Sequence, residues 1–149
     1  MINMIVPEQT LEAWQVSLRP SRVGEVPEGT ARIARAVFPN GCLAMRMRDV
    51  LGAVFTDDEF AAVFPSRGRP AISPALLAFV SVLQFGEGLT DQQAAHAVRA
   101  RIDWKYALGL ELGDTGFDHS VLCEFRARFV AGGMEQRVLD AALEALSTW

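Results

Sequence analysis

The sequence has few cysteines and lacks a long apolar run. Cys42 and Cys123 stand far apart, and the sequence lacks the two closely spaced cysteine or histidine pairs of a zinc site, so neither a disulfide framework nor a zinc site is indicated. We interpret both as small hydrophobic core residues. The longest uncharged stretch, residues 70–86, is shorter than the roughly 20 apolar residues of a membrane helix, and the N-terminus does not read as a secretion signal. These features predict a cytoplasmic protein without a membrane segment.

The chain also lacks an excess of positive charge and the alternating pattern of β-strands. Its 14 basic and 18 acidic residues leave a formal net charge of −4, which argues against a protein whose whole surface binds nucleic acid. Any DNA contact must therefore come from a local basic patch. Half of the residues are hydrophobic, enough for one core, and their spacing is helical. The sequence predicts an all-α, compact multi-helix domain.

The predicted centre of this domain is a buried helix at about residues 73–87. Ser73 and Pro74 supply a helix cap and a proline at the first helical position, as helix starts prefer. Apolar side chains then cover most directions of the helical wheel, which is typical of a helix buried on all sides. We expect its core residues to be Leu76, Leu77, Phe79, Val80 and Leu83.

Further helices are predicted on both sides of this one. Thr90 and Gln93 form a capping box, and the segments 90–101 and 119–131 could form a helix-turn-helix-like pair. An earlier helix has the apolar stripe Leu43, Met47, Val50, Leu51 and Val54, and the last helix is expected to bury Val138, Leu139, Ala142 and Leu146.

Proline and glycine divide the chain near its N-terminus. Residues 1–29 are predicted to be an N-terminal arm with a short helix at 8–17, and residues 30–149 a single helical domain.

The first candidate DNA contact is the loop before the central helix. Arg67 and Arg69 flank Gly68, and such a loop ahead of a helix N-terminus can offer both guanidinium and backbone N–H groups to a phosphate. The alternative is two solvated arginines.

A second candidate cluster contains Arg99, Arg101 and Lys105, although Asp103 lies among them and weakens their field. In the segment FRARF, Arg126 and Arg128 could mark a recognition helix. On the helical wheel, however, they flank the apolar stripe on its two opposite sides and do not share one exposed face. Ion pairing at the edge of the core is therefore the favoured interpretation.

Catalytic and metal-binding residues are not predicted. Asp57, Asp58 and Glu59 are adjacent, so on a helix they point about 100° apart and cannot face one metal pair; we interpret them as helix-capping charges. His96 and His119 have no nucleophile or carboxylate that spacing can place beside them, which favours solvated or capping roles.

An ordered set of motifs runs from residue 68 to residue 129. It comprises GRP before the proline-capped helix, LQ near the end of that helix, GLTD, R-x-DW-x-YALGL and D-x-S-x-L-x-x-FR-x-R. This set resembles the N-terminal domain of bacterial insertion-sequence transposases of the InsH kind, most strongly over residues 64–131.

The resemblance implies a protein that moves a DNA element by cutting and rejoining its ends. In that family an RNase H-like domain with a metal-bearing Asp, Asp and Glu site follows the helical domain. The chain stops at Trp149, so the catalytic carboxylates are expected to be missing. We expect no enzyme activity and no cofactor for this chain alone, with Mg²⁺ needed only by the missing catalytic domain.

Two classes of function remain open. The first is a DNA-binding and assembly domain of a transposase, with weak affinity for DNA. The second is an interaction module that pairs with another copy or with a full-length transposase, or a freestanding regulator of one. The acidic net charge favours the second class, and the Arg67–Arg69 loop favours the first.

Overall fold

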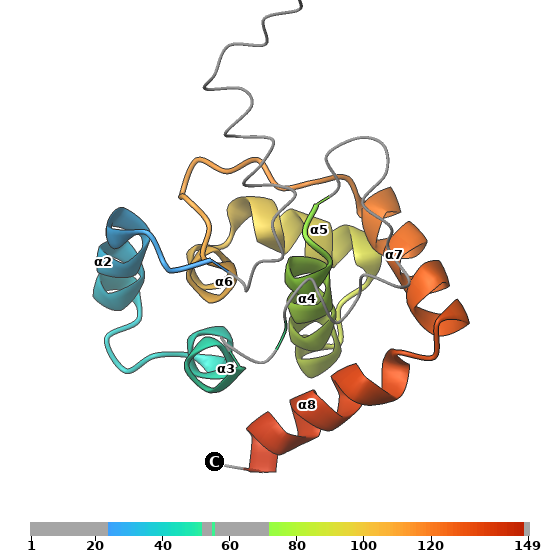
Figure 1. Ribbon diagram of the computed structural model, residues 1–149. Helices are drawn as coiled ribbons and strands as arrows, with labels where there is room; N and C mark the ends of the chain where they lie inside the picture. The colour runs from blue at the N-terminus through green and yellow to red at the C-terminus, as the bar shows by residue number, and fades with distance from the viewer. Residues whose placement is uncertain (1–23, 52–54, 56–71, 148–149) are drawn as a thin grey trace, which may run out of the picture.

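A computed structural model of the protein describes residues 24–51, 55 and 72–147. All regular secondary structure in this part is helical, which confirms the predicted all-α class (Figure 1). No helix there is long and apolar enough to cross a membrane. The helices are α2 (Glu28–Val37), α3 (Leu43–Leu51), α4 (Pro74–Glu87), α5 (Asp91–Ala100), α6 (Ile102–Leu108), α7 (His119–Ala131) and α8 (Glu135–Ser147).

The central helix α4 forms as its sequence predicts. The Ser73 hydroxyl accepts a hydrogen bond from the Leu76 amide, Pro74 occupies the first turn, and Gly88 ends the helix with a φ of 66°. That left-handed conformation favours glycine. Phe79, Val80 and Leu83 are fully buried. Leu76 is only half-buried at the edge of the core, so its predicted central place is wrong.

Helices α5, α6, α7 and α8 contact α4, and α3 contributes to the same main core, which also contains Phe55 and Phe117 from outside the helices. In α3, Met47 and Leu51 are buried, whereas Val50 is 40% exposed. In α8, Val138 is buried and Leu139 is 38% exposed. The predictions that Val50 and Leu139 are core residues are therefore wrong, whereas Val54 lies outside the described residues.

Helix α2 stands apart at the edge of the molecule, beside α6 (Figure 1). A small second core cluster of Ala34, Met45 and Tyr106 holds it there. The helix begins at Glu28, two residues earlier than the boundary drawn from the sequence, since Pro27 has the extended backbone of a residue before a helix.

Hydrogen bonds from two polar side chains, Thr30 and Arg48, also fix the start of α2. The buried Thr30 hydroxyl donates to the Leu110 carbonyl at 2.8 Å. Arg48 donates to the Gly24 carbonyl at 2.5 Å and to the Ala107 carbonyl at 3.2 Å. These bonds tie α2 and the residues before it to α3 and to the end of α6. The position of α2 is therefore set by hydrogen bonds as well as by apolar contact.

Replacing Phe79 with alanine should lower the free energy of unfolding by about 3–5 kcal/mol, because it removes a fully buried ring and leaves a cavity. Phe85, on the same helix but 67% exposed, provides the matched control, since Phe85→Ala should change stability by about 0.5 kcal/mol or less. Urea denaturation followed by circular dichroism measures both. Equal losses for the two variants would contradict the central position of Phe79.

Candidate nucleic-acid interface

The first predicted DNA contact cannot be placed. Arg67, Gly68 and Arg69 lie outside the described residues, as do the adjacent carboxylates Asp57 to Glu59 and the N-terminal segment 1–23. The phosphate-binding role of the Arg67–Arg69 loop therefore stays a prediction.

Arg101, from the second predicted cluster, is held by two carboxylates. It donates to both oxygens of Asp103, at 3.0 and 2.6 Å, and to Glu87 at 2.6 Å. The other oxygen of Glu87 accepts the Trp104 indole N–H at 2.8 Å. Burial alone would lower the pKa of Arg101, but these two carboxylates outweigh it and raise the pKa. Asp103 is buried rather than solvent-facing, because it serves as a partner of Arg101.

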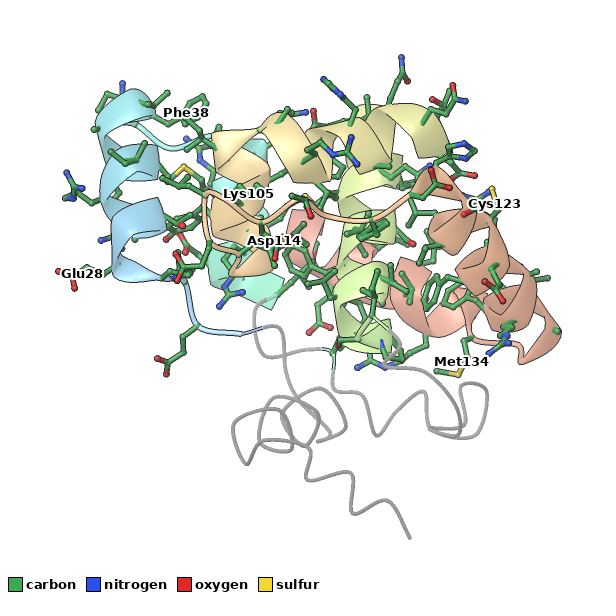
Figure 2. The ribbon with its side chains drawn as sticks, turned by 90° about the horizontal axis from the view of Figure 1, so that it is seen from above. Glu28, Phe38, Lys105, Asp114, Cys123 and Met134 are labelled. Carbon is green, nitrogen blue, oxygen red and sulfur yellow. The ribbon has the colours of Figure 1, made fainter. Side chains whose placement is uncertain are left out.

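Lys105 and Arg99 are bound to the loop that follows α6. Lys105 is 2% exposed, and its ammonium group donates to the Asp114 carbonyl (Figure 2). Burial lowers its pKa, although Asp114 partly offsets this effect. Arg99 is exposed and donates to the Thr115 carbonyl at 3.0 Å. A phosphate could reach Lys105 only if the contact with Asp114 opened.

Arg126 joins α7 to the start of α5. Its guanidinium donates to both oxygens of Asp91, one of them at 3.1 Å, and the Cys123 thiol donates to the same carboxylate at 3.1 Å. This arrangement fits the expected ion pairing at the edge of the core. Cys123 is exposed and Cys42 is half-buried, so the prediction that both are core residues is wrong for Cys123, whose thiol is bound at the surface.

Arg128 forms an i,i+4 ion pair with Glu124 at 3.7 Å, with both side chains more than half exposed. Helices α5 and α7 pack against each other, but α6 and a loop lie between them in the chain. A helix-turn-helix has only a short turn at that place. The predicted pair therefore exists as a packing unit and differs from a helix-turn-helix in its connection.

Two basic residues that the sequence analysis did not select lie on α2. Arg32 and Arg35 are exposed, and neither has an ion-pair or hydrogen-bond partner within the described part of the chain. Together with Val26, Glu28, Ala31 and Tyr106 they line a groove of about 600 Å³. Their spacing of three residues, which puts both on one helix face, was the signal available in the sequence.

Charge is distributed unequally between the two ends of the chain. Residues 24–51 contain four arginines and three carboxylates, whereas residues 72–147 contain six basic and ten acidic residues. The net charge is thus +1 for the part with α2 and α3, and −4 for the part from α4 to α8. In the described ranges no three His, Cys, Asp or Glu side chains come together as a metal site would need.

Comparison with known proteins identifies the family. A family model described as "Transposase domain (DUF772)" matches residues 32–128, well over half of the chain, from the middle of α2 to the last turns of α7. The protein belongs to this transposase-domain family. No curated protein and no solved structure matches it.

The Asp91–Arg126 contact should make stability depend on pH. Hydrogen bonds from Arg126, with further ones from Gln84 and Cys123, hold the pKa of Asp91 well below its ordinary value. A carboxyl with a lowered folded pKa contributes stability above the unfolded pKa, about 3.9, and loses it as pH falls towards the folded value.

Arg126→Gln should therefore reduce the free energy of unfolding at pH 7 by about 1 kcal/mol or less, given the half-exposed guanidinium, and should shrink the drop between pH 7 and pH 3. Denaturation at both pH values measures this effect. Arg128→Gln is the control on the same helix and should keep the wild-type pH dependence. An unchanged pH dependence in Arg126→Gln would refute the contact.

Proposed function

We propose that this protein acts in DNA transposition as a non-catalytic helical domain that binds DNA and contributes to the assembly of a transposase, in the manner of the InsH-type N-terminal domain. Membership of the transposase-domain family supports a role in transposition. The observation that carries the DNA-binding part is the basic end of the molecule, where α2 exposes two arginines without a partner among the described residues.

The low number of available cations limits the affinity for DNA. Arg101, Lys105 and Arg126 are engaged inside the domain, so few phosphates can be neutralised. Phosphate contacts of this kind are independent of sequence. The domain is therefore a weak, non-specific DNA binder that adds to the affinity of a larger transposase assembly for DNA.

Pairing of subunits is the second candidate function. Leu139 and Leu143 of α8 are 38% and 53% exposed and stand four residues apart, on one face of the helix. Exposed apolar residues on a helix face often mark a protein interface. A domain that pairs through this face without binding DNA would self-associate in sedimentation velocity and fail to bind duplex.

A fluorescence-anisotropy titration against random duplex tests the DNA-binding proposal. Two to four phosphate contacts predict a slope of log K against log salt of roughly −2 to −4. Arg67→Ala with Arg69→Ala should flatten the slope by about 2 if both side chains touch phosphate, and should weaken all sequences alike. Absence of wild-type binding at low salt would reject DNA binding and favour pairing.

The chain alone should neither nick nor join DNA. Two-metal phosphoryl transfer needs several carboxylates on ions about 4 Å apart, and none of the described carboxylates gather in this way. Supercoiled plasmid incubated with purified protein and Mg²⁺ or Mn²⁺ should remain intact. Metal-dependent cleavage that is lost on replacing one acidic residue of the chain would overturn this proposal.

A further inference from the structure

The groove beneath α2 combines features that suit a phosphate group. Arg32 and Arg35 lie at its edge, and Tyr106 forms part of its wall. The Tyr106 ring is 6% exposed, and its hydroxyl donates to Asp49 at 3.3 Å. The wall is therefore fixed, while the two guanidinium groups remain open to solvent.

The helix that carries these arginines is also held in place. Thr30 bonds to Leu110 on one side of α2, and Ala34 is completely buried against the small cluster. Arginines on a rigid helix lose less conformational freedom on binding than arginines on a loop. Side chains three residues apart have Cβ atoms about 5–6 Å apart, close enough for both to contact one stretch of a phosphate backbone.

We infer that the outer face of α2, with Arg32 and Arg35 over the groove, is a contact surface for the phosphate backbone of DNA. The inference rests on the proposed DNA-binding function and assigns it to a surface. Planar guanidinium groups bind phosphate oxygens through paired N–H donors. No base-reading side chain is required, so the contact positions the domain without selecting a sequence.

Glu28 limits where the phosphate lies. Its carboxylate belongs to the same groove and stands one helical turn before Arg32, at the opposite end of α2 from Phe38 (Figure 2). Like charges repel across such distances. The phosphate therefore lies on the Arg35 side of Arg32, and Glu28 opposes binding.

The test is an anisotropy titration of the full chain with random duplex. Arg32→Gln with Arg35→Gln should flatten the slope of log K against log salt by about 1.8, since each lost phosphate contact removes about 0.9. Each single variant, Arg32→Gln or Arg35→Gln, should flatten the slope by about 0.9. The charge-matched control for these single variants is Arg137→Gln on α8, which should leave the slope near the wild-type value. Arg32→Lys with Arg35→Lys retains both charges and should retain the slope.

A gain of affinity provides a second test that misfolding cannot mimic. Glu28→Gln removes the repulsive carboxylate and should tighten duplex binding by about 2–5-fold at low salt. Glu135→Gln changes the net charge equally at the start of α8, beside Met134, on the far side of the molecule from α2 (Figure 2). It should change affinity by less than about 1.5-fold. Circular dichroism confirms that each variant is folded.

The outcomes separate this inference from the proposed function. If the wild-type protein binds duplex and the Arg32→Gln, Arg35→Gln variant has the same salt slope, the α2 assignment alone is overturned. Equal changes in affinity for Glu28→Gln and Glu135→Gln overturn it as well. Failure of the wild-type protein to bind duplex rejects both. If the α2 double variant instead lowers the sedimentation coefficient of the free protein and leaves DNA binding unchanged, the face joins two copies of the chain and the inference is overturned.

Discussion

The need to bury α4 on every side is the constraint on which the rest of the structure depends. Its side chains are apolar in nearly all directions, and Phe79, Val80 and Leu83 have almost no exposed surface. Burial of such a helix is favourable by roughly 25 cal/mol per Å² of apolar area. Helices α5, α6, α7 and α8 pack against it and α3 joins the same core, which commits the apolar faces of these helices to the core. Only α2, supported by its own small cluster, stays outside this packing.

The same packing engages, in contacts within the domain, most of the described cations that the sequence analysis selected for DNA binding. Arg101, between α5 and α6, bonds to Glu87 of α4 and to Asp103 of α6, and Arg126 of α7 bonds to Asp91 at the start of α5. These arginines hold neighbouring helices at a fixed orientation as well as a fixed distance, because each forms a bidentate pair with a carboxylate. Apolar contacts are less directional. A phosphate would have to compete with partners that are already in place. The arginines proposed to contact DNA, Arg32 and Arg35, are thus different residues from those that join the helices.

The sequence predicts those parts of the fold whose signals are local. Ser73-Pro74 and the Thr90–Gln93 capping box each lie within one helical turn, and both form as expected. Ion pairs are different, since Asp91 and Arg126 are 35 residues apart and spacing does not show that they meet. For the same reason the sequence analysis selected Lys105, which is buried, and overlooked Arg32, whose availability follows from the position of α2 at the edge.

The acidic net charge is compatible with the proposed DNA contact once the positions of the charges in the fold are considered. At about 0.1 M salt the screening length is near 10 Å, whereas a small domain measures roughly 30 Å across. Helix α7 and the start of α8 lie at the other side of the molecule from α2 (Figures 1 and 2), so salt weakens the effect of their carboxylates on a phosphate beside Arg35. In the proposed contact, local charge governs the strength of binding at the outer face of α2. The distant negative charge repels DNA that approaches from the other side, and so favours the orientation in which α2 faces the duplex.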